Sequence, residues 1–129
     1  MRKFDDIAWH VPTSKREDVD YDYVPGPDEA GRKFLVEGEG GFWVQAVRIP
    51  PNFTAPVHRH SHAEVFMVVA GACEFDGEAM GPLDSTVVEG DTDYSFTSGP
   101  QGVTFMVTRL AIASYTEPGE KVGPEKVTR

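Results

Sequence analysis

The sequence is poor in cysteine and in long apolar runs, and both features narrow the class of protein. Cys73 is the single cysteine among 129 residues, so no internal disulfide can form, which is typical of a reducing compartment. No apolar stretch approaches the roughly 20 residues that span a bilayer. The opening residues MRKFDDIAWH also lack the apolar run of a signal peptide. We therefore expect a cytoplasmic protein without a membrane segment.

Positive charge is scarce as well. The chain has 12 Lys and Arg against 21 Asp and Glu, which gives a formal net charge of −9 at pH 7. The basic residues near the N-terminus are interleaved with acidic ones, so no basic stripe is present in the sequence. A chain of this charge is repelled by phosphates and by anionic lipids. We expect neither a nucleic-acid partner nor a membrane partner.

Helical periodicity is the third absence. No segment keeps a convincing apolar repeat of 3.6 residues over three turns. From residue 33 onward, short runs rich in β-branched and aromatic residues alternate with glycine, proline and aspartate. This pattern is typical of an all-β sandwich or barrel. The predicted strands are 34–36, 42–49, 57–60, 64–70, 72–75, 78–80, 86–89, 93–97 and 103–113.

The chain divides into three predicted parts around one hydrophobic core. Residues 1–32 form an N-terminal arm whose apolar side chains, such as Trp9, pack on the barrel or on a partner subunit. Residues 33–116 form the barrel, and the charged residues 117–129, rich in proline and glycine, form a flexible tail. Because exposed strand edges are usually covered and the arm offers a cover, we expect a homodimer.

The chain has only four histidines, but three of them lie within five positions. His58, His60 and His62 alternate with Glu64 in the run PVHRHSHAEVFMVVAG. Alternate residues of a strand project from one face, and imidazole and carboxylate are ligands of zinc, iron, nickel and manganese. A solvated edge strand is the weaker interpretation, because an apolar run follows directly. The pattern predicts a site for one divalent metal ion.

The spacing of these residues leaves two alternatives. Residues four apart on a straight strand are separated by about 13 Å, which is too far for one ion with bonds of about 2.0–2.1 Å. Either the side chains act only in pairs, or the chain bends between His60 and Glu64, where Ser61 and Ala63 are small. His62 is then either a metal ligand itself or a residue that contacts the ligands.

Residues 51–71 resemble the first signature of the cupin superfamily, His-x-His followed by Glu and then Gly. His58 and His60 match the pair, Glu64 follows after three residues, and Gly71 follows after six more. The resemblance implies a double-stranded β-helix, or jelly-roll, over roughly residues 33–115 with the metal in its mouth. It implies His58, His60 and Glu64 as ligands, and a bend that leaves His62 near the turn.

The second cupin signature, which ends in a histidine, is altered throughout. The best alignment places Leu83 at its first glycine and Tyr94 at its histidine. His10, the one remaining histidine, lies in the predicted arm. Tyr94 is then a metal ligand with a lowered pKa, an acid or hydrogen-bond donor to substrate, or a plain aromatic wall residue.

Two histidines and one carboxylate with open positions are the ligand set of non-haem Fe(II) oxygenases. We therefore favour Fe(II) over zinc, manganese and nickel, and a dioxygenase for a small ketone- or enol-type substrate. The line VRIPPNFTAPVHRHSHAE is similar to small cupin dioxygenases that cleave ketones and diketones. The alternatives are a zinc- or manganese-dependent isomerase, lyase or cyclase, and a non-catalytic barrel that binds a small molecule.

Strand alternation predicts which side chains line the substrate pocket. Phe66 shares the face of Glu64, Phe96 shares the face of Tyr94, and Phe105 contributes from the last strand. Gln45 supplies a polar group if the face that it shares with Trp43 points inward. Ordinary core packing is the alternative for each. The predicted pocket residues are His62, Phe66, Gln45, Phe96 and Phe105.

Overall fold

The computed structural model describes residues 1–10, 31–111, 114–116 and 123–124, and its strands follow the predicted runs. Two 3-10 helices, η1 (Phe4–Asp6) and η2 (Glu39–Gly41), are the helical elements of these residues. The strands are β1 (Gly31–Glu37), β2 (Trp43–Ile49), β3 (Arg59–His60), β4 (Glu64–Phe75), β5 (Glu78–Met80), β6 (Ser85–Val88), β7 (Phe96–Arg109), β8 (Ser114–Thr116) and β9 (Gly123–Pro124).

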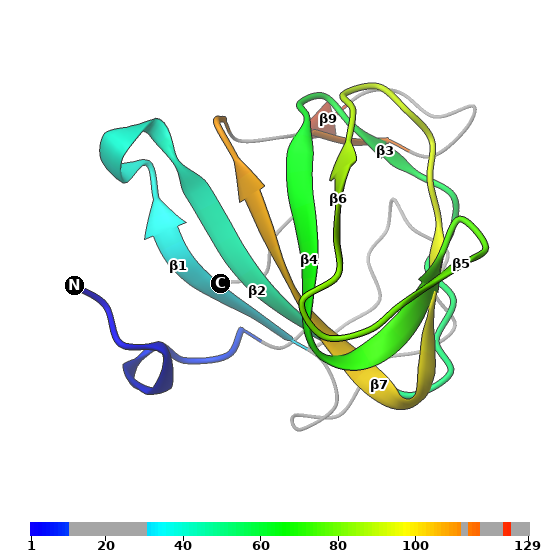
Figure 1. Cartoon of the computed structure of the whole chain (residues 1–129). Helices are drawn as coiled ribbons and strands as arrows, with labels where there is room; N and C mark the ends of the chain where they lie inside the picture. Colours follow the sequence, from blue (N-terminus) through cyan, green and yellow to red (C-terminus); the bar gives the residue numbers. More distant parts are fainter. Residues whose placement is uncertain (11–30, 112–113, 117–122, 125–129) are drawn as a thin grey trace.

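These strands form two antiparallel sheets (Figure 1). The larger sheet has the order β1-β2-β7-β4-β5, with β6 paired to β4, and the smaller has the order β3-β8-β9. The predicted all-β class is therefore confirmed. β9 lies within the segment predicted as a tail, most of which is outside the described residues. No helix in the described part of the chain is long and apolar enough to span a bilayer.

β4 and β7 are longer than the sequence predicted. The runs 64–70 and 72–75 join into one strand of 12 residues, and β7 continues through residues 99–102 for 14 residues. The two strands pair along most of their length, with register shifts between Val68 and Ala70 and between Gly71 and Cys73. Both strands curve strongly in Figure 1. The glycines that predicted strand ends instead lie where the strands bend.

Gly71 and Gly102 meet at this bend, and both positions require glycine. Their φ angles are +70° and +78°, a region that other residues rarely adopt. A Cβ atom on Gly71 would lie 2.2 Å from the carbonyl oxygen of Gly102, and one on Gly102 would lie 2.7 Å from that of Ile49. The bend therefore depends on two positions without a side chain.

The inward face of β4 and β7 carries an aromatic core. Phe66 is fully buried, stacks on Phe105 with ring centroids 4.3 Å apart, and contacts Phe75 at 5.0 Å. Cys73 is buried in the same core, and this burial raises the pKa of its thiol. Because Phe66 is two residues from Glu64 on one strand, the core lies next to the buried end of β4 that carries the glutamate.

The first ten residues pack on β1 and β2 of the same chain. The ammonium group of Lys33 donates a hydrogen bond to the carbonyl oxygen of Phe4 at 2.7 Å and lies 3.8 Å from the centre of the Phe4 ring. The guanidinium of Arg48 lies 4.3 Å from the centre of the Trp9 ring. One of the two predicted alternatives for the arm, contact with its own barrel, therefore holds for residues 1–10.

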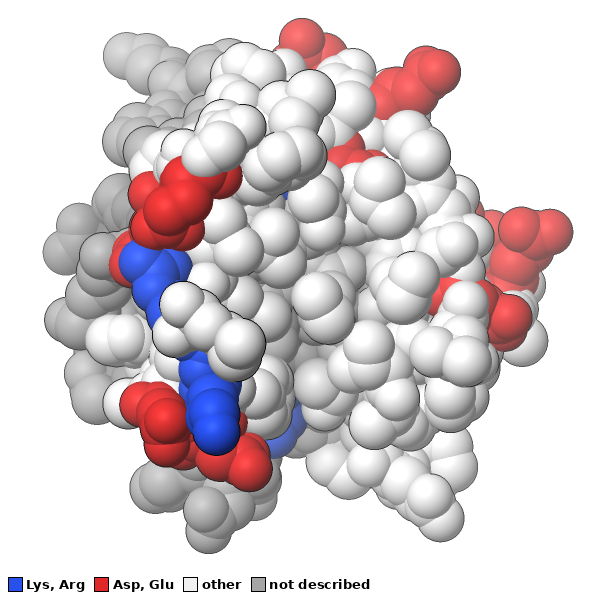
Figure 2. Space-filling model, turned by 60° about the vertical axis from the view of Figure 1, so that its left-hand side comes forward, with Lys and Arg blue, Asp and Glu red and all other residues white. Residues whose placement is uncertain are grey.

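The surface reflects the acidic composition. Figure 2 shows a face on which the few Lys and Arg side chains lie beside acidic ones, while most of the surface is uncharged. Two exposed ion pairs show the same arrangement, Arg2 with Glu39 at 2.7 Å and Arg59 with Asp93 at 3.4 Å. The charges of Arg2 and Arg59 are thus neutralised locally by acidic neighbours.

Candidate functional site

The predicted bend between His60 and Glu64 is present. β3 ends at His60 in the smaller sheet, β4 begins at Glu64 in the larger sheet, and residues 61–63 between them are not in a strand. On the other side, His58 forms an isolated β-bridge with Tyr94, with backbone hydrogen bonds of 3.1 and 2.9 Å. This arrangement brings residues from two parts of the chain to one end of the fold.

Four of the side chains predicted for the site lie together in the interior. His58, His60, Glu64 and Tyr94 are each at most 6% exposed. The ring centroids of His58 and His60 are 5.1 Å apart, and that of His58 is 4.4 Å from the Tyr94 ring. Tyr94 therefore lies beside both histidines, at the place where the signature alignment puts a fourth site residue.

A chain of hydrogen bonds connects three of these residues. The Tyr94 hydroxyl donates to Oε1 of Glu64 at 3.1 Å, and Nε2 of His60 lies 3.1 Å from the same hydroxyl. A hydroxyl has one proton, so when Tyr94 donates to Glu64, Nε2 of His60 is the donor to the tyrosine oxygen. The hydrogen bonds then run in one direction, from His60 through Tyr94 to Glu64.

Arg109 completes this chain, and the sequence analysis missed it. Its Nε donates to Oε2 of Glu64 at 2.7 Å, and its Nη2 lies 2.6 Å from the same oxygen. The two side chains are 5% and 1% exposed, and the register of β4 and β7 places the two residues opposite each other. Strand alternation predicts that the side chain of Phe105 points inward, and the same face continues through Val107 to Arg109. The sequence pattern therefore places Arg109 on the inward face.

The predicted aromatic pocket residues are part of the core. Phe66, Phe96 and Phe105 are buried, and the Phe96 ring lies 6.0 Å from that of Phe66 and 5.4 Å from that of Phe105. Phe75 extends the cluster to the site, since its ring stacks on Tyr94 at 5.2 Å. The aromatic side chains thus support the polar chain from the inside of the fold.

The two polar pocket residues lie elsewhere. His62 is exposed, and its Nδ1 is 2.8 Å from the hydroxyl oxygen of Ser61. Gln45 is half-buried on β2, where its amide oxygen accepts a hydrogen bond from Arg32 at 2.9 Å. The structure therefore does not bring His62 or Gln45 into the hydrogen-bonded chain.

The residues of the site fit a divalent cation in their chemistry. Nδ1 of His58 lies 2.7 Å from the carbonyl oxygen of Pro56, which favours the tautomer with its lone pair on Nε2, as in many metal-binding imidazoles. Donor atoms that share an ion with bonds of about 2.0–2.1 Å lie about 3.0–3.4 Å apart. The distances from the Tyr94 hydroxyl to His60 and to Glu64, both 3.1 Å, are within that range for the alternative in which Tyr94 is itself a ligand.

Two features limit this fit. Both oxygens of Glu64 already have partners, Tyr94 and Arg109. Within the described ranges of the chain, no three His, Cys, Asp or Glu side chains converge as a group that could hold a metal ion. Ligation by His58, His60 and Glu64 therefore stays a prediction.

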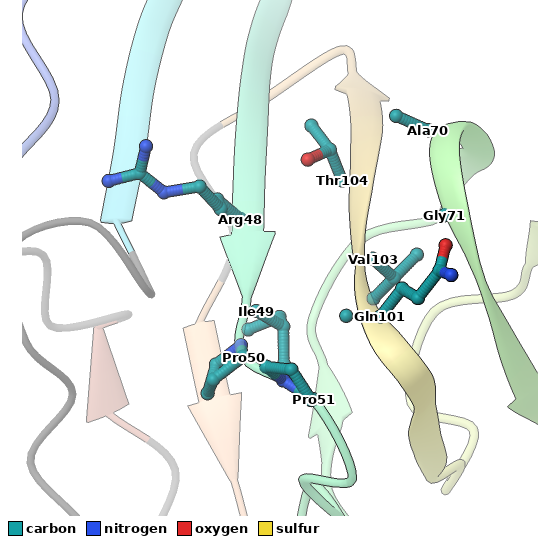
Figure 3. A pocket seen from close by; sticks show the side chains of 10 residues that line it. Arg48, Ile49, Pro50, Pro51, Ala70, Gly71, Gln101, Val103 and Thr104 are labelled. Atoms are coloured by element: carbon teal, nitrogen blue, oxygen red, sulfur yellow. The ribbon is translucent and has the colours of Figure 1, made fainter.

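A separate hollow of about 230 Å³ lies at the bend of β4 and β7 (Figure 3). In Figure 3 the guanidinium of Arg48 points toward β1 and away from Gln101 and Val103. No member of the buried chain lines this hollow, so we do not place the site there. Its lining residues are Arg48, Ile49, Pro50, Pro51, Ala70, Gly71, Gln101, Gly102, Val103 and Thr104.

A comparison with family models decides which family the sequence represents. Residues 15–82, more than half of the chain, match the ChrR cupin-like domain. The chain belongs to the ChrR cupin-like family. The cupin resemblance predicted from His58, His60 and Glu64 is thereby confirmed for the fold. A comparison of this ChrR cupin-like chain with curated proteins finds no match.

Solved structures similar to this ChrR cupin-like chain include enzymes. An RmlC-like cupin from Ralstonia eutropha has a TM-score of 0.67 at 12% identity, over 94% of this chain and 74% of its own. A sugar phosphate isomerase of the cupin superfamily from Silicibacter pomeroyi has a TM-score of 0.65 at 22% identity, over 92% of this chain and 81% of its own. The polyketide cyclase RemF from Streptomyces resistomycificus has a TM-score of 0.63 at 20% identity, over 84% of this chain and 78% of its own. At such identities the similarity shows the fold alone.

Proposed function

We propose that this cupin is an enzyme that binds one divalent metal ion and moves protons on a small carbonyl- or enol-type molecule. The observation that carries the proposal is the buried chain of His60, Tyr94, Glu64 and Arg109. Buried polar and charged groups cost more to place in a core than apolar packing does, and they are common at functional sites. A cluster of this kind, supported by an aromatic core, is suited to acid–base chemistry shielded from water.

This proposal favours the isomerase or cyclase alternative over the dioxygenase. Similar structures with a named activity include an isomerase, a cyclase and an oxalate decarboxylase, and none of these names describes an oxygenation. The dioxygenase hypothesis rests on the ligand set and on the similarity of the line VRIPPNFTAPVHRHSHAE to small cupin dioxygenases. Because the same ligands serve Lewis-acid chemistry, the ligand set does not separate the two reactions.

The residues have distinct proposed roles. His58, His60 and Glu64 hold the metal, and a bound divalent cation supplies Lewis acidity toward a substrate oxygen. Tyr94 is the proton donor to the substrate, because its hydroxyl already lies between a ring nitrogen and a carboxylate oxygen at 3.1 Å each. Glu64 orients that hydroxyl through Oε1 and takes part in returning its proton.

Metal content is the first test. Protein from cells supplied with iron, manganese and zinc is analysed for metal per chain, together with H60A, E64Q and H62A. We expect close to one ion per chain in the wild type and in H62A, because His62 is exposed and outside the buried chain. H60A and E64Q lose the ion. Equal uptake by all four proteins contradicts the proposed ligands.

The reaction type is tested on a panel of ketones, diketones and ketoses in heavy water. We expect deuterium to enter the carbon next to a carbonyl in at least one compound, without oxygen uptake. Stoichiometric oxygen consumption by the iron-loaded protein supports the dioxygenase instead.

A non-catalytic barrel that binds a small molecule is the second candidate. The exchange of a histidine for Tyr94 in the second signature and the lack of a converged ligand group favour it. Ligand binding without turnover, without metal, and unchanged in H58A would establish this role.

A further inference from the structure

The ion pair of Glu64 and Arg109 is the most deeply buried charge pair of the described residues. The two side chains are 1% and 5% exposed, and Nη2 lies 2.6 Å from Oε2. The other two salt bridges, Arg2 with Glu39 and Arg59 with Asp93, are 39% to 59% exposed. Water and salt screen such exposed pairs but screen a buried pair much less. The charge of Glu64 is therefore balanced from within the fold.

We infer that Arg109 sets the affinity of the site for a divalent cation, and that it keeps this affinity low. The inference rests on the proposed metal site and adds a residue that determines its strength. Arg109 and a cation held by Glu64 would share one carboxylate. Two like charges on one carboxylate repel strongly where little water screens them. The guanidinium and the metal thus compete for the same negative charge.

Arg109 also orients Glu64, and this second effect would strengthen metal binding. Groups that hydrogen-bond a ligating carboxylate also orient it, and their removal typically weakens metal binding about 10- to 100-fold. Orientation is supplied twice at this site, because Tyr94 holds Oε1 at 3.1 Å independently of Arg109. Glu64 is also fixed by its place at the start of β4, paired with Val88 and Arg109. Loss of the guanidinium therefore removes the repulsion while most of the orientation remains.

The state without metal shows the same effect of Arg109 on metal affinity from the other side. Without Arg109, a buried carboxylate is left without its countercharge, which is strongly unfavourable. A bound cation restores the balance of charge in the variant, whereas in the wild type the balance already exists. Metal binding is therefore expected to be tighter when the arginine charge is removed.

The experiment measures the dissociation constant for Mn²⁺ and for Zn²⁺ in metal-free wild type, R109Q, R109K and R59Q. We expect R109Q to bind at least about tenfold more tightly. R109K keeps the charge and stays near the wild type. R59Q is the matched control, because it removes the same charge from an exposed pair next to His58 and His60. It is expected to leave the affinity unchanged.

The possible results distinguish the inferred role of Arg109 from the proposed metal site on which it rests. Weaker binding by R109Q than by the wild type overturns the inference and makes Arg109 an orienting group of a genuine metal site. No uptake by any variant overturns both the inference and the proposed metal site.

Folding of the variants is followed by thermal unfolding with and without saturating Mn²⁺. R109M, which fills a similar volume without charge, is the second variant. A variant that is unstable without metal and gains more stability from Mn²⁺ than the wild type supports the inference. A variant that gains no more than the wild type overturns it.

Discussion

Tyr94 is a phenol at a position where the cupin signature has a histidine, and this change alters the chemistry of the site. A histidine would supply a lone pair to a metal, whereas the hydroxyl of Tyr94 donates to Glu64 and lies 3.1 Å from Nε2 of His60. The residue is therefore suited to donate a proton.

The variant Y94F tests this role. Phenylalanine keeps the ring that stacks on Phe75 at 5.2 Å but removes the hydroxyl. We expect turnover of a substrate found in the panel to fall about 100-fold or more, while the free energy of unfolding falls by about 1–3 kcal/mol. Steady-state kinetics and urea unfolding measure the two effects. Turnover within a few fold of the wild type would make Tyr94 a wall residue.

The sequence located the site residues that are close together in the chain. His58, His60 and Glu64 lie within seven positions, so their spacing alone predicted a common site and a bend. Arg109 is 45 residues from Glu64, and its contact depends on the register of two strands. Strand alternation predicts that Arg109 points inward, but no local pattern predicts its partner. Pairing between distant strands leaves no local pattern in the sequence.

At the scale of elements, β4 and β7 determine where the site lies. Each is a long strand bent near its middle, and Glu64 and Arg109 are at paired ends of the two strands. The sequence predicted their parts as separate strands, because glycine usually marks a turn. In the fold the glycines at 71 and 102 instead permit the bend. A glycine with a positive φ angle occurs both in bulges and in turns, so the sequence does not distinguish the two.

Replacement of two glycines by alanine separates backbone strain from steric conflict. Gly71 and Gly77 have φ angles of +70° and +84°, but only at Gly71 would a Cβ atom collide with backbone, 2.2 Å from the Gly102 carbonyl oxygen. We expect G77A to cost about 1–2 kcal/mol of unfolding free energy, and G71A to cost about 3 kcal/mol or more. Urea unfolding measures both. Equal costs would contradict the close approach of β4 and β7 at the bend.

At the scale of the whole molecule, the N-terminal residues cover part of the large sheet away from the site. The arm is held by Lys33 and Arg48 through the rings of Phe4 and Trp9. None of these residues belongs to the hydrogen-bonded chain of the site. Stability of the arm and chemistry of the site should therefore be separable. The homodimer predicted from the sequence stays a prediction.

The variant W9A tests this separation. The indole of Trp9 lies against Arg48 at 4.3 Å and Lys33 at 4.9 Å, so its loss removes packing and two cation–π contacts. We expect the free energy of unfolding to fall by about 2–3 kcal/mol, with metal affinity unchanged. F42A is the control, because Phe42 is 48% exposed and its loss costs little. A change in metal affinity in W9A would show that arm and site are coupled.

We propose that the buried residues His58, His60 and Glu64 hold a divalent cation beside Tyr94. The most direct measurement is a crystal structure of the protein grown with Zn²⁺, with anomalous difference maps recorded above and below the zinc edge. We predict one peak within bonding distance of Nε2 of His58, a ring nitrogen of His60 and an oxygen of Glu64. A map with no peak there, or with zinc only at exposed side chains such as His62, would contradict it.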